Sequence, residues 1–520
     1  MSNLSTTFTA IPHTLLQAMQ RGIERETLRM QNDGFLAQTP HPQGLGSALT
    51  HAKITTDYSE ALLEFISSPK KNIHDVLAEL NEIHHISNQN LPEGEKMWSM
   101  SMPCMLDSND EQIPLAYYGT SNIGRLKTLY RRGLGVRYGR RMQTIAGVHY
   151  NLSFPDSLFE YLQQNEQDSQ LKALSLQDYR SHRYFGLIRN FIRLIPLVMY
   201  TIGASPAVCA CFLTGRQHHL QPFVKGSYYL PNATALRMGN LGYQNTAQKS
   251  LGIHYNDLTG YLKGLQAAVH TKFAPFAELG LSDEQGEPTQ MNDHILQIEN
   301  EYYSLIRPKQ IPQAGETPSQ ALANRGVAYV ELRAVDINPY NPIGIDSTTA
   351  GFLETLALYC LMIDSPIITA EEQELIDLNQ QNMVNDGRNA QLKIHHLTGE
   401  VLFKDWAMNH LQQMEQYAHN LDQAMNDRLY HQAIKTMQIR VEQPEQTLSA
   451  RLLADIEQHG STWKLGEYLA QQHQQFYQSI QLDDDKVAYY QQLAQQSLSQ
   501  QQQLEQQQDI DFMQYLQQYR

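Results

Sequence analysis

The chain has 520 residues, of which 41% are hydrophobic and 18% charged, as in an ordinary folded globular protein and unlike a disordered or fibrous one. Its 39 lysines and arginines against 54 aspartates and glutamates give a formal net charge of −15, which argues against a nucleic-acid-binding protein, because such proteins neutralise phosphates with a basic surface. An acidic chain can still bind a nucleotide when bound cations carry positive charge to the phosphates.

The first 22 residues lack the basic and apolar regions of a secretory signal peptide, so we expect a cytoplasmic protein. Residues 15–22 resemble the end of an amphipathic helix, and residues 74–89 have the apolar spacing of a surface helix. Residues 91–94, 103–119 and 308–319 contain Pro and Gly and are expected to be loops.

Two acidic residues share a strand face with apolar ones in residues 22–30. Period-two alternation places Glu24 and Glu26 on the same side as Leu28 and Met30. Two such carboxylates resist burial unless a cation lies between them. A solvated face with Glu–Arg pairs across strands explains this segment equally well when it is taken alone.

Residues 55–66 run from a turn into an apolar stretch that contains Glu64. A helix would place Asp57, Glu60 and Glu64 on one face, whereas a strand from Leu62 onward isolates Glu64 among large apolar residues. We favour the strand, in which an unpartnered Glu64 is costly.

Residues 144–154 alternate in the same way. His149, Asn151 and Ser153 share one face, and the opposite face is apolar. A single histidine on a strand is more often a core residue than a ligand, so His149 becomes a candidate only with carboxylates nearby.

Residues 194–213 are uncharged over about the length that spans a bilayer. Pro196 and Pro206 break this stretch, which predicts a buried helix, a turn and a strand instead. Cys209 and Cys211 would share one face of that strand. A redox pair is one interpretation, but with only Cys104 and Cys360 besides them and no CxxC spacing, buried thiols in a reducing compartment are the preferred one.

Two later segments add polar groups. Residues 295–303, taken as a strand, place Gln297, Glu299, Glu301 and Tyr303 on one face, and Arg307 and Lys309 follow in an expected loop. Residues 327–336 form a predicted strand in which Glu331 and Arg333 share a face, either as a structural pair or as a ligand beside an anion-binding group.

From about residue 404 the chain is rich in Gln, Leu and Ala without strand patterns, which predicts a helical periphery with a frayed Gln-rich end. A coiled-coil partner helix is the alternative, but the heptad is not sustained.

Several strands with inward carboxylates and few thiols favour magnesium or manganese, and magnesium with carboxylates and basic residues is typical of phosphoryl transfer. The sequence contains no P-loop, kinase, HExxH or GxSxG motif. A bound nucleotide would therefore be held mainly through metal-bridged phosphates on a sheet, as in carboxylate–amine ligases of the glutamine-synthetase type.

Nine collinear segments between about residues 20 and 350 together resemble the proteobacterial type of glutamate–cysteine ligase. They are GIERETLRM, LGSALTHAKITTDYSEALLEFIS, SMPC, YGTSNIGRLKTLYRRGL, QTIAGVHYNLSFP, GASPAVC, YYLPNATALRMGNLGY, LQIENEYYSLIRPK and VELRAVDINPYNPIGID. The resemblance implies an α+β fold, with a glutamine-synthetase-like funnel of antiparallel sheet flanked by helices. It implies a catalytic core over residues 1–345 and a mainly helical region over residues 346–520.

The resemblance also implies a reaction, in which ATP activates the γ-carboxylate of glutamate as an acyl phosphate and the amine of cysteine then displaces phosphate. The product is γ-glutamylcysteine, made in the first step of glutathione synthesis. The implied partners are glutamate, cysteine, ATP and Mg²⁺ (or Mn²⁺), and the implied state is a monomer.

The site residues that the resemblance implies fall into four groups. The metal ligands are Glu24, Glu26, Asp57, Glu64, His149 and Glu331, with less support for Gln297 and Glu299. Arg333 and, less strongly, Arg131 lie near the transferred phosphoryl group, and Arg307 and Lys309 contact the nucleotide. Cysteine is bound by Tyr58, Tyr130, Leu134, Gln143 and Ile145 around its side chain and by Arg237, Tyr243 and Tyr303 toward its carboxylate.

Three alternatives stay open at this point. A ligase with another amine acceptor would share the metal face and differ only in the cysteine pocket. A two-metal phosphohydrolase would also need clustered carboxylates, although it has no use for an amino-acid carboxylate anchor. A non-catalytic scaffold would gain nothing from buried acids, which destabilise a fold unless they are used.

Overall fold

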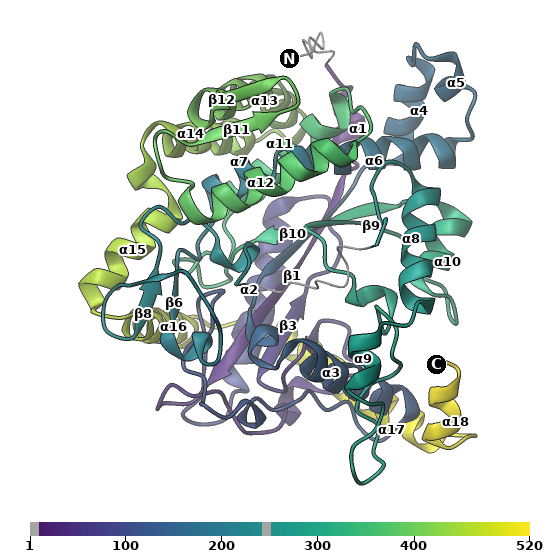
Figure 1. The fold of residues 1–520 in the computed structure, drawn as a ribbon, viewed down its shortest axis with the longest axis vertical. Coiled ribbons are helices and arrows are strands. Elements are labelled where there is room, and N and C mark those ends of the chain that lie inside the picture. Colours follow the sequence, from purple (N-terminus) through teal and green to yellow (C-terminus); the bar gives the residue numbers. More distant parts are fainter. Residues whose placement is uncertain (1–9, 242–250, 520) are drawn as a thin grey trace.

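The centre of the molecule is an antiparallel sheet, which the computed structural model shows together with the rest of residues 10–241 and 251–519 (Figure 1). Its seven strands have the order β2-β3-β1-β5-β10-β9, with β4 paired to the Arg29–Met30 end of β1. The strands are β1 (Gln20–Met30), β2 (Ile54–Thr56), β3 (Leu62–Ile66), β4 (Lys96–Met97), β5 (Val148–Ser153), β9 (Ile306–Lys309) and β10 (Tyr329–Val335). The expected α+β class with an antiparallel sheet is confirmed.

The four predicted acidic or histidine-bearing strands all exist. Residues 22–30 lie within β1, the strand expected from Leu62 is β3, and residues 148–153 and 329–335 form β5 and β10. The prediction for 144–154 was too long at its start, because Arg141–Thr144 forms a 3₁₀ turn. Alternation works here because each of these strands has one face on the core and the other on the site described below.

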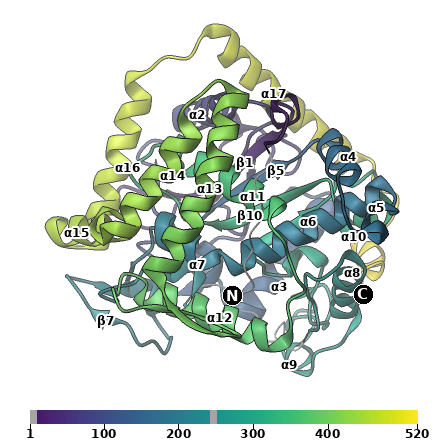
Figure 2. The same cartoon turned by 90° about the horizontal axis from the view of Figure 1, so that it is seen from above.

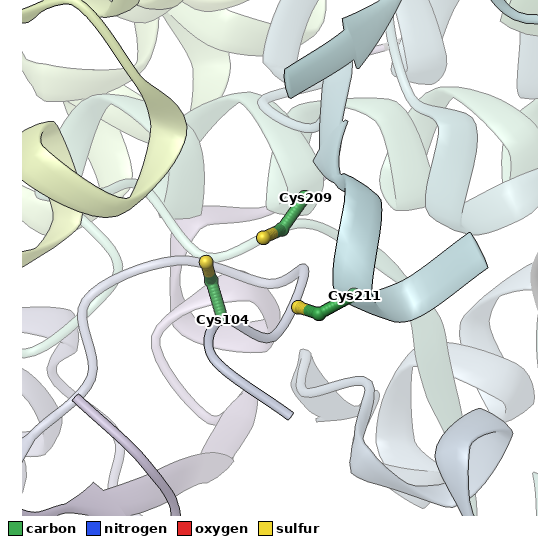
Figure 3. A group of neighbouring side chains, drawn as sticks. All are labelled: Cys104, Cys209 and Cys211. Carbon is green, nitrogen blue, oxygen red and sulfur yellow. The ribbon is translucent and has the colours of Figure 1, made fainter. Parts of the chain in front are cut away.

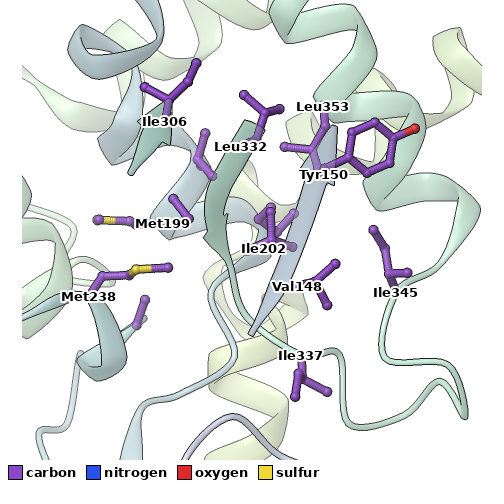
Figure 4. Packing of buried hydrophobic residues seen from close by; sticks show 14 of the residues in the cluster. Val148, Tyr150, Met199, Ile202, Met238, Ile306, Leu332, Ile337, Ile345 and Leu353 are labelled. Carbon is purple, nitrogen blue, oxygen red and sulfur yellow. The ribbon is translucent and has the colours of Figure 1, made fainter. Parts of the chain in front are cut away.

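Helices surround the central sheet (Figure 1). They are α1 (His13–Leu16), α2 (Ile73–Gln89), α3 (Asn122–Tyr138), α4 (Asp156–Gln164), α5 (Ser169–Lys172), α6 (Leu176–Arg193), α7 (Ile195–Ile202), α8 (Leu258–His270), α9 (Ala274–Glu278), α10 (Pro318–Arg325), α11 (Ser347–Met362), α12 (Ala370–Asp386), α13 (Phe403–Met425), α14 (Leu429–Glu442), α15 (Leu448–His459), α16 (Thr462–Ser479), α17 (Asp484–Gln506) and α18 (Phe512–Gln517). Helices α2, α6 and α7 contact the sheet, and α11 lies against α2 and α6. Val148, Tyr150 and Leu332 of the sheet pack in one buried cluster with Leu353 of α11 (Figure 4).

A polar network crosses this core at one point. Arg21 of β1 forms a fully buried double hydrogen bond with Glu354 of α11, at 2.7 and 2.6 Å. The hydroxyls of Tyr150 and Tyr430 donate to the same carboxylate at 2.6 and 2.9 Å. Because every charge here has its partners, the network joins the sheet to α11 and α14 without an orphaned buried ion.

Helix α2 has the predicted extent but is more buried than the surface helix expected. His84 contacts Phe65 of β3, with ring centroids 4.6 Å apart, and on its other side stacks near Tyr477 of α16 at 6.3 Å. The sequence pattern predicts the apolar face of α2 that packs on the sheet. It does not predict that α16, much later in the chain, packs against the other side of α2.

Residues 194–213 form the predicted helix, turn and strand, α7 followed by β6 (Ala207–Cys209), and β6 pairs with β8 (Ser227–Tyr229), which pairs with β7 (Gln221–Pro222). Strand β6 ends at Cys209, and a 3₁₀ turn covers Ala210–Leu213, so Cys209 and Cys211 do not share a strand face as expected. Within residues 10–241 and 251–519, no single helix is long and apolar enough to cross a membrane. Helices α6 and α7 reach that length and apolar character only when they are counted together, and the chain bends by 58° between them.

Three further expectations are corrected. Residues 15–22 are not the end of a long helix, because α1 stops at Leu16 and β1 begins at Gln20. Residues 295–303 form no strand and contain a 3₁₀ turn at Glu299–Glu301, whereas the expected loop at 306–309 is strand β9. The predicted loop at 308–319 is correspondingly shorter, since it lies between β9 and Pro318 of α10.

The carboxyl-terminal region is helical from α13 onward, after a short hairpin of β11 (Lys393–His396) and β12 (Gly399–Leu402). Figure 2 shows α13 and α14 beside α11, and α17 along the outer edge of the molecule. The Gln-rich end does not fray as expected. Helix α18 packs Phe512 and Leu516 into a small buried cluster with Leu126 and Leu129 of α3.

Candidate active site

The strand register brings the predicted acids and His149 onto one face of the sheet. Glu24 is the partner of His149 in the β1–β5 pairing, and Glu26 is the partner of Glu64 in the β1–β3 pairing. Because residues two apart on a strand share a face, Glu331 of β10, which pairs with Asn151, belongs to the same surface.

His149 lies at the centre of this group. Its Nδ1 is 3.1 Å from Glu24 Oε2 and 3.8 Å from Glu331 Oε1, and its Nε2 is 3.7 Å from Glu26 Oε1. The other oxygens of two of these acids are held by the sheet itself. Asn151 donates to Glu24 Oε1 at 2.9 Å, and the Gly147 amide donates to Glu26 Oε2 at 2.7 Å.

Basic residues border the group on the β10 and β9 side. Arg333 Nη1 is 3.3 Å from Glu331 Oε1 and 3.4 Å from His149 Nδ1, and Lys309 Nζ is 3.5 Å from Glu331 Oε2. Most of the acids lie on β1 and β3, whereas Glu331 lies on β10 among the cations, so a ligand placed across the face meets both signs of charge.

The pKa values of the acids are shifted in opposite directions. Burial pushes the pKa of Glu24 up, but the hydrogen bond with His149 and the charges of His149 and Lys309 together hold the pKa below its ordinary value. Burial also acts on Glu331, where Arg333 and Lys309 bring the pKa below its ordinary value. Burial and then the charges of neighbouring acids, Glu24 first, raise the pKa of Glu64 well above its ordinary value.

This donor set fits a hard divalent cation. Two groups, Glu24–His149–Glu331 and Glu26–Glu64–His149, each offer ligand atoms within 4.8 Å of one another. Carboxylate oxygens are the preferred ligands of Mg²⁺ and Mn²⁺, and a cation among them would remove the repulsion that raises the pKa of Glu64. Asp57, between β2 and β3, is outside these two groups, but its charge acts on both Glu26 and Glu64.

Arg131 approaches the same region from α3. Its guanidinium donates to the carbonyl of Asp57 and lies over the Tyr118 ring, 4.6 Å from the centroid. Lys127, one turn earlier, lies over the same ring at 4.9 Å. Burial and the adjacent Arg131 lower the pKa of Lys127 to about 8.

The residues predicted around the cysteine side chain come from α3 and the segments beside it. Leu134 and Tyr58 are buried, and Tyr130, Gln143 and Ile145 are partly buried. The Tyr58 hydroxyl and the Gln143 side-chain nitrogen are buried and make no hydrogen bond within the protein. Buried polar groups are normally paired, so both are suited to contact a ligand.

Arg237 is positioned by two kinds of contact. Its Nε donates to Asp336 at 2.8 Å and its Nη2 donates to the Val335 carbonyl at 2.8 Å. Its Nη1 lies over Gly147, where a Cβ atom would approach to 2.8 Å, so glycine is required for this close approach. The charges of Arg237 and Arg333 act on partly buried Tyr303, although desolvation is the stronger effect and raises its pKa. Tyr243 lies outside the described residues.

Other predicted residues have different surroundings. Arg307 of β9 is the strand partner of Glu331 and donates to the carbonyls of Asn300 and Tyr302. Gln297 bridges the Met291 amide and the Tyr130 carbonyl, and Glu299 accepts from the backbone and hydroxyl of Ser319. The structure therefore does not bring Gln297 and Glu299 into the carboxylate groups.

Sequence reasoning missed two residues of this region. Asn151 lies between Glu24 and Glu331, and its position on the His149 face was the available signal. Lys127 precedes Arg131 by one helical turn, and only the fold brings it near Glu64.

Comparison with known proteins gives one consistent family. Residues 6–383 match the family model described as glutamate-cysteine ligase. The glutamate–cysteine ligases of Alcanivorax borkumensis and Pseudomonas paraeruginosa are both 44% identical to the chain, over 97% of its length and 96% and 95% of theirs.

Solved structures of related proteins have the same fold. The glutamate–cysteine ligase of Francisella tularensis in complex with AMP is 36% identical and superposes with a TM-score of 0.89, covering 96% of this chain and 97% of that one. A bifunctional glutathione synthetase from Pasteurella multocida, at 24% identity and a TM-score of 0.71, shares the fold over 89% of this chain and 53% of its own.

Proposed function

The chain belongs to the glutamate–cysteine ligase family, and we propose that the face of the sheet carrying Glu24, Glu26, Glu64, His149 and Glu331 is its catalytic centre. The activity is the ATP-dependent joining of the glutamate γ-carboxylate to the amine of cysteine, which is the first step of glutathione synthesis. The observation that carries the site proposal is the register, which collects these side chains from four strands on one face.

The chemistry needs two transfers. A carboxylate cannot expel oxide at neutral pH, so its oxygen first attacks the γ-phosphorus of ATP, and the bond to ADP breaks. The cysteine amine then attacks the acyl carbon of the γ-glutamyl phosphate, loses a proton and expels inorganic phosphate. Both steps develop negative charge on phosphoryl oxygens, which positioned cations stabilise.

The carboxylate groups would hold magnesium, with manganese as a chemically similar alternative. The proposed ligands are Glu24, Glu26, Asp57, Glu64, His149 and Glu331. When bound there, the ion supplies positive charge to the phosphate oxygens of ATP. The opposed pKa shifts of Glu24 and Glu64 support this, because acids packed this closely are stable as anions only with a counter-charge.

The basic residues supply the remaining charge. Arg333 is placed beside Glu331 and His149 to contact the transferring phosphoryl group, and Arg131 approaches from α3. Arg307 and Lys309, on the neighbouring strand β9, would contact the nucleotide phosphates. A planar guanidinium binds a phosphate through two parallel hydrogen bonds, which suits Arg333 to this role.

Cysteine would bind between α3 and the Arg237 region. Tyr58, Leu134, Gln143, Ile145 and Tyr130 would surround its side chain, and the two buried unpaired polar groups, Tyr58 Oη and Gln143 Nε2, support this. Arg237, Tyr303 and Tyr243 would bind its carboxylate. Arg237 is held rigidly by Asp336, so little conformational entropy is lost when a ligand binds.

We also propose that residues 1–345 form the catalytic core and that residues 346–520 support it from the opposite side of the sheet. The buried pairing of Arg21 with Glu354 supports the second role. A monomer is the expected functional state, since each chain carries every group named above.

The test measures ADP release and product formation with Mg²⁺ and ATP, adding glutamate alone, cysteine alone and then both. We expect rapid ADP release only with both amino acids, in a 1:1 ratio with γ-glutamylcysteine. Ammonia and 2-aminobutyrate replace cysteine in parallel reactions. ADP release without amino acids would indicate hydrolysis, and a preference for ammonia would overturn the assignment of the acceptor.

A further inference from the structure

Three of the four cysteines meet away from the carboxylate face. Cys104 lies in the loop after β4, Cys209 ends β6 and Cys211 lies in the following 3₁₀ turn. Their sulfur atoms are all within 4.8 Å of one another. Figure 3 shows the three side chains converging from two separate segments of the chain.

Both segments are held in place by contacts other than those between the three thiols. The Leu106 amide donates to Cys211 Sγ at 3.3 Å, and Arg141 donates to the Cys211 carbonyl at 2.7 Å. The Ala210 amide, between Cys209 and Cys211, donates to the Gly226 carbonyl at 2.8 Å, and in the Cys104 segment the Met105 amide donates to the Gly34 carbonyl at 2.9 Å. The backbone thus fixes the positions of the sulfurs before any ligand binds.

The spacing of the three sulfur atoms is compatible with a bound metal ion. At a Zn–S bond length of about 2.3 Å, sulfurs in tetrahedral or trigonal sites are about 3.8–4.0 Å apart, which is within the observed limit. Cys104 is fully buried and Cys209 is nearly so, whereas Cys211 is half-exposed, so a small ion can enter from the Cys211 side.

The ligand type determines the class of ion. Thiolates select soft or borderline ions such as Zn²⁺ and Cu⁺ and disfavour Mg²⁺ and Mn²⁺, which the carboxylate face suits. A dication also offsets two of the three thiolate charges that binding would create, whereas a monovalent ion offsets only one. Three protein ligands leave a fourth position for water, as in other zinc sites with an open position.

We propose that Cys104, Cys209 and Cys211 form a binding site for one thiophilic divalent d¹⁰ ion, Zn²⁺ or its analogue Cd²⁺. Binding forms three metal–sulfur bonds and releases the thiol protons to solvent. The ion would link the loop after β4 to β6 and its following turn, two segments far apart in the sequence. The site is separate from the catalytic proposal and does not depend on it.

The test titrates the reduced, metal-free full-length protein with Cd²⁺ and records the ultraviolet charge-transfer band of Cd–thiolate bonds. Carboxylates give no such band, so binding at the catalytic face does not interfere. We expect the band to saturate at one Cd²⁺ per chain.

Five variants locate the site. Cys104→Ser, Cys209→Ser and Cys211→Ser should each reduce the band and weaken Cd²⁺ binding at least tenfold, while Cys360→Ser, a buried thiol in α11, should bind as the wild type does. Glu24→Gln should also keep the full band. Cys211 is the most exposed of the three, so Cys211→Ser tests the proposal even if the buried variants fail to fold.

Thermal unfolding gives a second measurement. Zn²⁺ should raise the Tm of the wild type and of Cys360→Ser but not that of Cys211→Ser. The proposal fails if the wild type shows no charge-transfer band, if Zn²⁺ leaves the Tm of the wild type unchanged, or if Cys211→Ser keeps a full-strength band.

Discussion

Glu26 and Glu64 face each other directly in the antiparallel pairing of β1 with β3, two carboxylates in a position where opposite charges or apolar pairs stabilise a sheet. Burial and the neighbouring acids raise the pKa of Glu64. The unfolded chain therefore releases this proton at a lower pH than the folded chain does, and stability contributed by Glu64 falls as the pH rises above the ordinary glutamate value.

Glu64→Gln should therefore stabilise the metal-free protein at pH 8 by up to about 1 kcal/mol while reducing ligation. The gain should shrink as the pH is lowered through the ordinary glutamate pKa of about 4.3, below which Glu64 is protonated in both states. Urea unfolding in EDTA across this range measures it. Mg²⁺ should then stabilise the wild type more than the variant. A destabilised variant at pH 8 would show that the two acids do not oppose each other.

Arg333→Ala should lower kcat by about 100- to 1000-fold, because a charge that stabilises the transferring phosphoryl group is lost. Its effect on the KM for cysteine should be small, since the cysteine site lies elsewhere. Arg451→Ala is the control, because Arg451 is an exposed arginine over the Tyr340 ring and should leave kcat unchanged. An equal fall in both variants would remove Arg333 from the catalytic centre.

Arg237→Ala should raise the KM for cysteine by about 10- to 100-fold, the loss of one charge-assisted contact to a carboxylate, while changing the KM for glutamate little. Because the substitution also leaves Asp336 without its ion-pair partner, the protein should become less stable. Arg237→Lys separates the two effects, since an ammonium can still pair with Asp336. Equal changes in both KM values would place Arg237 outside the cysteine site.

Glu354→Gln should destabilise the protein by about 3–5 kcal/mol, because Arg21 keeps its charge in the core and loses its carboxylate. Tyr430→Phe removes a single hydrogen bond from the same network and should cost only about 1 kcal/mol. Chemical unfolding of both variants checks this order. A larger effect for Tyr430→Phe would mean that the ion pair is not the stabilising element.

Helix α18 should affect catalysis because it packs against α3. Leu516 is fully buried against this helix, which carries Tyr130, Arg131 and Leu134, so Leu516→Ala should weaken the packing by about 2 kcal/mol or more and raise the KM for cysteine. Gln514→Ala, an exposed position in the same short helix, is the matched control. Wild-type kinetics in Leu516→Ala would show that α18 does not support the site.

The sequence predicts the strands of the carboxylate face because period-two alternation places Glu24 with Glu26 on β1 and His149 with Asn151 on β5. The same rule fails at residues 295–303. There the Glu301 carboxylate accepts from the Gln297 amide at 2.7 Å and pairs with Arg137 at 3.1 Å, so polar side chains satisfy local and α3 partners instead of lining a strand face.

Long-range packing is the other part that local patterns cannot supply. Phe512 and Leu516 are two apolar residues in a polar tail, and their partners in α3 lie in the first third of the chain. Cys104 is likewise far in sequence from Cys209 and Cys211, so only the fold reveals that the three sulfurs meet. Lys127 joins the site for the same reason.

The most direct measurement is the rate of γ-glutamylcysteine formation by Glu331→Gln and by the wild type over a range of Mg²⁺ concentrations. Gln keeps the shape of Glu331 but removes its charge, so a metal-holding role predicts a loss of about 100-fold or more, with a folded protein by circular dichroism. Ligation by Glu331→Gln at the wild-type rate at low Mg²⁺ would contradict the assignment of this sheet face as the metal-dependent catalytic centre.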